Sequence, residues 1–191
     1  MRKLIAGMKM ALDGRVAGPE GVADWVDGWS EDFGITPQVD ACLLGAGMYP
    51  SYEQYWTEIQ NEPAGRHPFT GEVPTQGEVE WARFAAKTPH YVLAGSLASA
   101  QWPQTSFVRT LDEIESLKQR SGKDIYLIGG ARTTASLIDA GLVDELRLLV
   151  YPLIAGEGTD LFATHGNRRG LQLRKVEQLA DGRLSLNYEL R

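Results

Sequence analysis

The stretch that decides the fold is "DIYLIGGARTTASLIDAGLVDEL", residues 124–146. Its apolar run 124–128 predicts a buried strand, and the periodic segment 131–140 predicts a helix. Gly129 and Gly130 join the two. Because glycine has no Cβ, such a pair either makes a tight turn or admits a ligand that must approach the backbone. A strand followed at once by a helix is the building unit of an α/β fold.

Strands alternate with helices on both sides of this stretch. The hydrophobic periodicity predicts further strands at 4–12, 15–18, 40–45, 90–95 and 144–153, and helices at 22–33, 50–59, 78–87 and 110–123. The chain closes with two alternating runs, 170–179 and 184–190, which the turn "ADGR" joins into a hairpin. This order predicts an α/β sheet that is mostly parallel and has an antiparallel edge.

Length and composition suit one domain over residues 1–191. The chain has 191 residues and 43% hydrophobic residues, enough to bury a substantial core. Residues 60–77 hold three prolines and three glycines. We expect a loop insertion there, since loops of this length are either functional or disordered.

Charge and residue usage exclude several classes of function. The net charge of −6 argues against a nucleic-acid binder. The sequence contains no run of about 18 apolar residues, so we expect no membrane span. Cys42 is the only cysteine, which excludes an internal disulfide and a cysteine zinc cluster. His67, His90 and His165 are scattered, so we expect no metal site. A cytoplasmic protein with a small-molecule substrate is the expectation.

Three predicted strands end in small residues. These ends are Gly45-Ala46-Gly47, Gly95-Ser96 and Gly129-Gly130. Parallel strands bring their carboxyl ends to one edge of a sheet, which is where α/β proteins bind ligands. Helix N-termini at such an edge attract phosphate groups. Each end alone favours a turn, but the three together favour a nucleotide.

Other residues offer weaker signals. Asp24, beside Trp25, is a candidate proton donor, and its alternative interpretation is an exposed helix residue. Cys42 lies in an apolar run and is expected to be a small core residue. The aromatic residues form the core or line a pocket for a flat ligand. They are Trp25, Trp29, Tyr52, Tyr55 and Trp56.

Several segments together resemble the dihydrofolate reductase-like superfamily. They are "MALDGRVAG", "LLGAGMY", "YVLAGSL" and the long block that runs from "DIYLIGG" to "GEGTDLF". The chain is most similar to the reductase domain of the bifunctional riboflavin-biosynthesis deaminase-reductase. The resemblance implies a three-layer α/β/α fold, a homodimer, and NADPH-dependent reduction of a small heterocycle, such as 5-amino-6-(5-phosphoribosylamino)uracil.

The resemblance also implies which residues bind NADPH. It implies that Gly129 and Gly130 are often joined by a cis peptide and lie beside the pyrophosphate with the start of the following helix. The implied cofactor-binding residues are Ala11, Leu12, Asp13, Gly14, Val16, Gly45, Ala46, Gly47, Met48, Tyr49, Ser96, Gly129, Gly130, Ala131, Arg132, Thr133 and Thr134. The acidic residue of dihydrofolate reductase is matched only loosely, by Asp24.

Two departures from the family pattern leave the substrate open. The riboflavin reductase domain reads Lys-x-Ala-x-Ser-x-Asp-Gly on its first strand. With Asp13-Gly14 as the anchor, Gly7 takes the lysine position and Ala11 the serine position. The single cysteine also excludes a zinc deaminase half. The alternatives are therefore a riboflavin-type reductase, a dihydrofolate or pterin-type reductase, and a non-catalytic NADPH-binding protein of the same fold.

Overall fold

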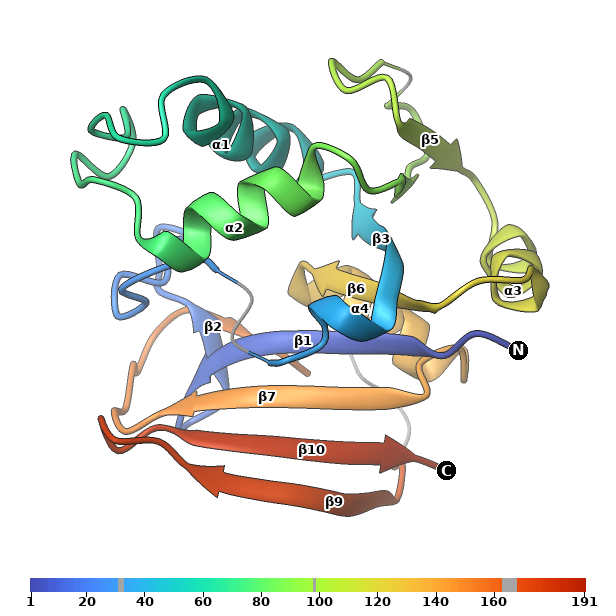
Figure 1. The fold of residues 1–191 in the computed structure, drawn as a ribbon. Coiled ribbons are helices and arrows are strands. Elements are labelled where there is room, and N and C mark those ends of the chain that lie inside the picture. Colours follow the sequence, from blue (N-terminus) through green and yellow to red (C-terminus); the bar gives the residue numbers. More distant parts are fainter. Residues whose placement is uncertain (31–32, 98, 163–167) are drawn as a thin grey trace.

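The computed structural model describes residues 1–30, 33–97, 99–162 and 168–191, and within them eight strands form one sheet (Figure 1). Its spatial order is β5-β4-β3-β6-β1-β7-β10-β9. The strands are β1 (Leu4–Ala11), β3 (Val39–Gly45), β4 (His90–Leu93), β5 (Thr105–Val108), β6 (Asp124–Gly129), β7 (Glu145–Tyr151), β9 (Leu171–Gln178) and β10 (Leu184–Leu190). Pairs from β5 through β7 are parallel, and β10 pairs antiparallel with both β7 and β9. The predicted mostly parallel sheet with a C-terminal hairpin is confirmed.

Helices cover both faces of this sheet. They are α1 (Tyr49–Asn61), α2 (Gln76–Ala85), α3 (Leu111–Gln119) and α4 (Ala131–Asp139), with a short 3-10 turn, η1 (Thr36–Gln38). Buried side chains of α1 and α2 share one apolar cluster with the sheet, and those of α3 and α4 share another. The expected three-layer arrangement is therefore present. Within the described residues, no helix is long and apolar enough to span a membrane.

A second, small sheet lies beside the end of β1. Strand β2 (Arg15–Ala17) pairs antiparallel with β8 (Thr159–Asp160). The Asp13 carboxylate supports this corner by accepting hydrogen bonds from the backbone N–H groups of Ala155 (3.3 Å) and Gly156 (2.8 Å). These contacts tie the turn after β1 to the segment that follows β7.

The predicted helix at 22–33 is wrong. Its described part, residues 22–30 and 33, consists of turns, bends and irregular backbone, and Glu31 and Asp32 lie outside the described residues. Side chains from elsewhere in the fold bind the backbone groups that a helix would pair internally. Two carbonyls of 28–30 accept hydrogen bonds from Lys9, and the N–H between them donates to Glu78. The apolar spacing instead reflects packing of Ala23 and Val26 against β7.

Side chains of β1 alternate between the two faces of the sheet. Leu4, Ala6 and Met8 pack in the cluster that includes α3 and α4. Ile5 packs in the opposite cluster, and Lys9 lines a cavity on the opposite face. Near its carboxyl end the strand also borders this cavity, through Gly7, Met8 and Lys9.

Candidate functional site

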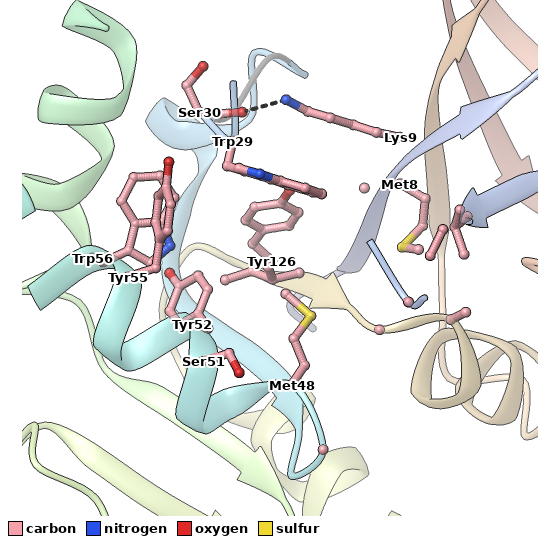
Figure 2. A pocket seen from close by; sticks show the side chains of 18 of the residues that line it. Met8, Lys9, Trp29, Ser30, Met48, Ser51, Tyr52, Tyr55, Trp56 and Tyr126 are labelled. Atoms are coloured by element: carbon pink, nitrogen blue, oxygen red, sulfur yellow. Dashed lines mark hydrogen bonds between the residues drawn. The ribbon is translucent and has the colours of Figure 1, made fainter. Parts of the chain in front are cut away.

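A cavity of about 540 Å³ lies near the carboxyl ends of β1 and β6, next to α1 and the small β2–β8 sheet (Figure 2). Small-molecule sites typically have volumes of about 300–1,000 Å³, so the cavity can hold a ligand. Glycines and aromatic rings make up much of its lining; we call Gly47 and Gly130 the glycine wall and the aromatic residues the aromatic wall. The lining residues are Gly7, Met8, Lys9, Val16, Ala17, Gly21, Trp29, Ser30, Phe33, Gly47, Met48, Ser51, Tyr52, Tyr55, Trp56, Trp81, Tyr126, Ile128, Gly130, Ala131 and Thr159.

The glycine wall has free space where side chains would be. A Cβ built on Gly47 meets no atom within 4 Å, and one built on Gly130 meets only the Met48 Sδ at 3.9 Å. Both positions line the cavity. The peptide between Gly129 and Gly130 is cis, as the family resemblance implied.

Helix α4 begins at this wall without a side-chain cap. Its N-cap is Gly130, which has no side chain to accept a hydrogen bond from the first turn. The first N–H groups of a helix lack intrahelical partners and carry partial positive charge. The start of α4, with Gly130 and Ala131 lining the cavity, is therefore suited to an anionic group such as a pyrophosphate.

Gly45 has a different role from that of Gly47. A Cβ on Gly45 would clash with the Thr133 Oγ1, so glycine there lets β3 pack closely against α4 without moving that side chain. The missing side chain at Gly45 thus serves helix–sheet packing, which sets where the N terminus of α4 lies relative to the cavity.

The structure brings some of the implied cofactor residues together and sets others apart. Five of them line the cavity: Val16, Gly47, Met48, Gly130 and Ala131. Others are buried in the fold, namely Ala11, Gly45, Tyr49, Gly129 and Thr134. Leu12, Asp13, Ser96 and Arg132 are exposed, and Gly14, Ala46 and Thr133 are half-buried. Asp24, the candidate proton donor, is exposed and is not among the residues that line the cavity.

The aromatic wall is larger than the sequence indicated. Of the five aromatic residues singled out from the sequence, four line the cavity and Trp25 does not. The wall also contains Phe33, Trp81 and Tyr126, which sequence reasoning missed. Tyr126 was not found because it looks like an ordinary apolar residue of β6; only the sheet topology shows that its ring faces α1 and α2.

A chain of hydrogen bonds fixes part of this wall. The Trp81 Nε1–H donates to the Tyr52 Oη (3.2 Å), and the Tyr52 hydroxyl lies 3.2 Å from the His90 Nε2. The other ring nitrogen, Nδ1, lies 2.7 Å from the Thr88 carbonyl oxygen. Burial lowers the pKa of His90 to about 4, although the hydrogen bond to Thr88 opposes this shift. We therefore assign the neutral tautomer with its proton on Nδ1.

The segment that carries Trp29 is held from two sides. The Lys9 Nζ donates to the carbonyl oxygens of Gly28 (2.7 Å) and Ser30 (3.2 Å), as Figure 2 shows for Ser30. The Trp29 N–H donates to the Glu78 Oε1 at 3.1 Å, and the Tyr55 hydroxyl donates to the same oxygen at 2.9 Å. Strand β1 and helix α2 together fix the position of Trp29. The role of Lys9 could not be recognised from the sequence, because the Gly28 and Ser30 carbonyls that it binds lie about twenty residues further along the chain.

Glu78 also caps α2. Its carboxylate accepts hydrogen bonds from the Thr75 N–H and hydroxyl, both at 2.9 Å, in a capping box. Burial alone would raise the pKa of Glu78, but hydrogen bonds from Thr75, Trp29 and Tyr55 outweigh it and hold the pKa below its usual range. Glu78 is therefore a stable anion at neutral pH. A second capping box joins Thr110 and Glu113 at the start of α3.

The described lining of the cavity contains one charged side chain, Lys9, and neither a carboxylate nor a histidine. Across the described part of the chain, no group of three or more His, Cys, Asp or Glu is placed to hold a metal ion, and His165 lies outside it. A smaller cavity of about 270 Å³ adjoins the first and shares Trp29 and Tyr55 with it. Residues 67–75 of the predicted loop insertion help to line it.

Comparison with known proteins connects this geometry to a family. The family model of the RibD C-terminal domain matches residues 2–184. The uncharacterized protein YyaP of Bacillus subtilis (strain 168) is 30% identical over 192 residues, which cover 98% of this chain and 94% of that protein.

Solved structures of low identity share the fold. A protein of Shewanella sp. PV-4, whose name connects it to riboflavin biosynthesis, has a TM-score of 0.70 at 17% identity, with 99% of each chain covered. A deaminase and 5-amino-6-(5-phosphoribosylamino)uracil reductase of Thermotoga maritima has a TM-score of 0.63 at 16% identity. That match covers 100% of this chain and 57% of the larger protein.

Proposed function

The chain belongs to the RibD C-terminal domain family, and from this premise we propose that it is a cytoplasmic, NADPH-dependent reductase of a small heterocyclic substrate. One observation carries the proposal: the glycine wall and the uncapped N terminus of α4 meet at a cavity of about 540 Å³. An extended dinucleotide needs a close backbone approach and an anion site of this kind.

The proposal gives the residues of the chain separate tasks. When bound, NADPH supplies the hydride. The start of α4, at Gly130 and Ala131, holds the pyrophosphate, and Gly47 and Met48 bind the cofactor beside it. The other implied cofactor residues support this wall or bind the outer parts of the cofactor. The aromatic rings exclude water and orient the substrate. The proposal assigns the proton to no side chain, since the described lining offers no carboxylate or histidine.

We extend the proposal to the whole chain and its assembly. Residues 1–191 act as one reductase domain, and two copies form a homodimer. Support for the dimer comes from the outermost strand of the sheet, β9, where Leu171, Leu173 and Val176 are 43%, 49% and 55% exposed. An exposed edge strand that carries apolar side chains is a ready site for pairing with another chain.

Thermal denaturation with NADPH tests the cofactor assignment. At a concentration of 100 times Kd, NADPH should stabilise the protein by about 2.7 kcal/mol. For a chain of this size, this stabilisation raises Tm by roughly 5–10 °C. If neither NADPH nor NADH changes Tm, the proposal is wrong.

Turnover separates an enzyme from a binding protein. A panel of pterins and pyrimidines is supplied with NADPH, and the loss of NADPH absorbance is followed. Consumption of NADPH with one of these rings supports the reductase. Cofactor binding with no turnover of any ring would favour a non-catalytic NADPH-binding protein, an alternative already raised by glycine and alanine at positions 7 and 11.

A further inference from the structure

The walls of the cavity point to a narrower class of substrate than the family does, and this inference rests on the proposed function. We propose that the cavity takes a flat, uncharged heteroaromatic ring without a phosphate group, and that Lys9 and Glu78 are positioning residues that hold Trp29 against that ring.

Aromatic side chains reach the cavity from separate parts of the fold. Trp29 comes from the irregular segment after β2, Tyr55 from α1 and Tyr126 from β6, and Figure 2 shows them around one space with Met48 beside Tyr126. Aromatic faces and a thioether bind a flat ring through dispersion and quadrupole interactions. Such a wall offers little to a flexible, strongly hydrated group.

The cavity lacks the charge that a substrate phosphate would need. A buried anion is costly unless cations or hydrogen bonds neutralise it. Lys9 is the cation of the described lining, and at least two of its three N–H groups already donate to the Gly28 and Ser30 carbonyls. In the proposed function, the N terminus of α4 is occupied by the cofactor pyrophosphate.

The position where the family carries its lysine is blocked. A Cβ on Gly7 would lie 2.9 Å from ring atoms of both Phe33 and Tyr126. A long basic side chain at position 7 therefore cannot enter the cavity without moving two rings of its wall. The rings of Phe33 and Tyr126 occupy the space that a lysine side chain at position 7 would need.

Two opposite charges then fix Trp29. Lys9 donates hydrogen bonds to the carbonyl oxygens of the residues on either side of Trp29. Glu78 accepts hydrogen bonds from the Trp29 N–H and from the Tyr55 hydroxyl. Hydrogen bonds to ionised groups are stronger than neutral ones, so they can order a segment that has no regular secondary structure. Lys9 and Glu78 therefore act on the substrate through the position of Trp29.

Matched pairs of ligands test the substrate class. A pterin, a pyrimidine and an isoalloxazine are each prepared with a hydroxyalkyl side chain, free or phosphorylated. Dissociation constants are measured on NADPH-saturated protein from quenching of tryptophan fluorescence. We expect the uncharged member of at least one pair to bind about tenfold more tightly than its phosphorylated partner. The proposal is overturned if no uncharged member binds, or if the phosphorylated members bind as tightly or better.

The same samples keep this test apart from that of the proposed function. A Tm increase with NADPH, together with a preference for phosphorylated rings, would reject the substrate class and leave the reductase intact. Absence of any Tm change with NADPH would reject the reductase itself.

A double-mutant cycle tests the positioning role. Lys9→Met should weaken binding of the preferred ring about tenfold, as the loss of hydrogen bonds to a charged group implies. Lys87→Met, an exposed lysine outside the cavity, is the matched control and should change nothing. In a Trp29→Ala background, Lys9→Met should have no further effect on ring binding, because Lys9 acts through Trp29. Trp29→Phe should recover part of the affinity.

Additive effects of the two substitutions would show that Lys9 does not act through Trp29 and would overturn the positioning role. Unaltered ring binding in Trp29→Ala would do the same. The Kd of NADPH, measured on each variant, reports whether the glycine wall is intact. A selective loss of ring binding with an unchanged Kd for NADPH is the signature that general destabilisation would not give.

Discussion

Gly47 and Gly130 line the cavity, and a methyl group added at either position would make no close contact with the protein. We predict that Gly47→Ala and Gly130→Ala each weaken NADPH binding, because the methyl group takes space that the cofactor needs. An overpacked contact costs about 1–3 kcal/mol, which corresponds to roughly 5–150-fold in Kd. Titration with NADPH measures the effect, and the Tm of the cofactor-free Gly47→Ala protein should change by less than about 2 °C.

Gly170→Ala supplies the control for this pair of variants. Gly170 is exposed, its added Cβ also meets no atom within 4 Å, and it lies outside the cavity lining. The Kd of the Gly170→Ala protein for NADPH should match that of the unmodified protein. If the two cavity glycines tolerate alanine equally well, their role is that of a turn and not of a cofactor wall.

For Gly7→Ala we predict a different result from that of the two cavity variants, namely a loss of stability. Its added Cβ would lie 2.9 Å from the rings of Phe33 and Tyr126, and both rings are part of the packed cavity wall. Gly7→Ala should therefore destabilise the protein by about 1–3 kcal/mol and lower Tm by roughly 2–12 °C. Thermal denaturation beside Gly47→Ala gives the comparison. An unchanged Tm would mean that the two rings move aside easily, and the argument against a basic side chain at this position would fail.

At the scale of elements, His90 links β4 to α1 and α2. Its ring contacts Tyr52 and Trp102 and is fully buried, and Tyr52 in turn accepts a hydrogen bond from Trp81 of α2. A proton on the Nε2 would remove the acceptor for the Tyr52 hydroxyl and leave a charge without solvent. The contact between sheet and helices on this face therefore depends on a neutral ring.

This dependence predicts a loss of stability in mild acid. The unfolded chain protonates His90 near its ordinary pKa of 6.5, whereas the folded protein does so only near 4. Between these values the unfolded state binds more protons, so stability is complete above pH 6.5 and falls as the pH decreases towards 4. The shift corresponds to about 3 kcal/mol. Melting curves from pH 7 to 4 should show a steeper fall for the unmodified protein than for His90→Gln; equal slopes would contradict the assignment.

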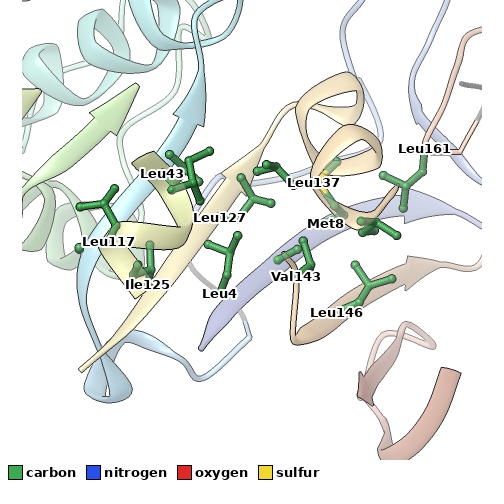
Figure 3. Packing of buried hydrophobic residues seen from close by; sticks show 14 of the residues in the cluster. Leu4, Met8, Leu43, Leu117, Ile125, Leu127, Leu137, Val143, Leu146 and Leu161 are labelled. Carbon is green, nitrogen blue, oxygen red and sulfur yellow. The ribbon is translucent and has the colours of Figure 1, made fainter. Parts of the chain in front are cut away.

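Elements defined by local contacts could be predicted from the sequence. Leu4, Leu127 and Leu137 come from β1, β6 and α4, and Figure 3 shows them in one apolar layer, as the alternating and helical spacings indicated. Two strands were missed. Strand β5 has four residues and β8 only two, and β8 exists because β2 lies beside it. The helix predicted at 22–33 was wrong because partners distant in the sequence take its backbone groups.

The residues of the site also fall into those that could be predicted from the sequence and those that could not. The glycine-bearing ends of β3 and β6 could be found because their composition is local and their shared edge follows from a parallel sheet. Lys9 and Tyr126 could not, since each gains its role from residues that the fold brings from elsewhere. Composition alone could not separate the roles of Gly45 and Gly47. Both are glycines at the end of the same strand, but Gly45 packs against Thr133, whereas Gly47 borders open space.

At the scale of the whole molecule, the C-terminal hairpin leaves one long edge of the sheet unpaired among the described residues. Strand β9 is that edge, and it pairs only with β10. Register places Leu173 opposite Tyr188 and Val176 opposite Leu186, so these side chains extend the apolar face that α3 and α4 cover elsewhere. A second copy of the chain that packs there would remove this surface from water.

Leu173→Lys tests the proposed homodimer at this edge. Leu173 is 49% exposed, so a lysine there can remain solvated in a monomer, but it would be buried without a partner in a dimer that uses this face. We predict that the unmodified protein sediments as a dimer and Leu173→Lys as a monomer with little change in its helix and strand content. Glu177→Lys adds a lysine to the opposite face of the same strand and should stay dimeric. A monomeric unmodified protein would reject the dimer, and dissociation of both variants would place the interface elsewhere along β9.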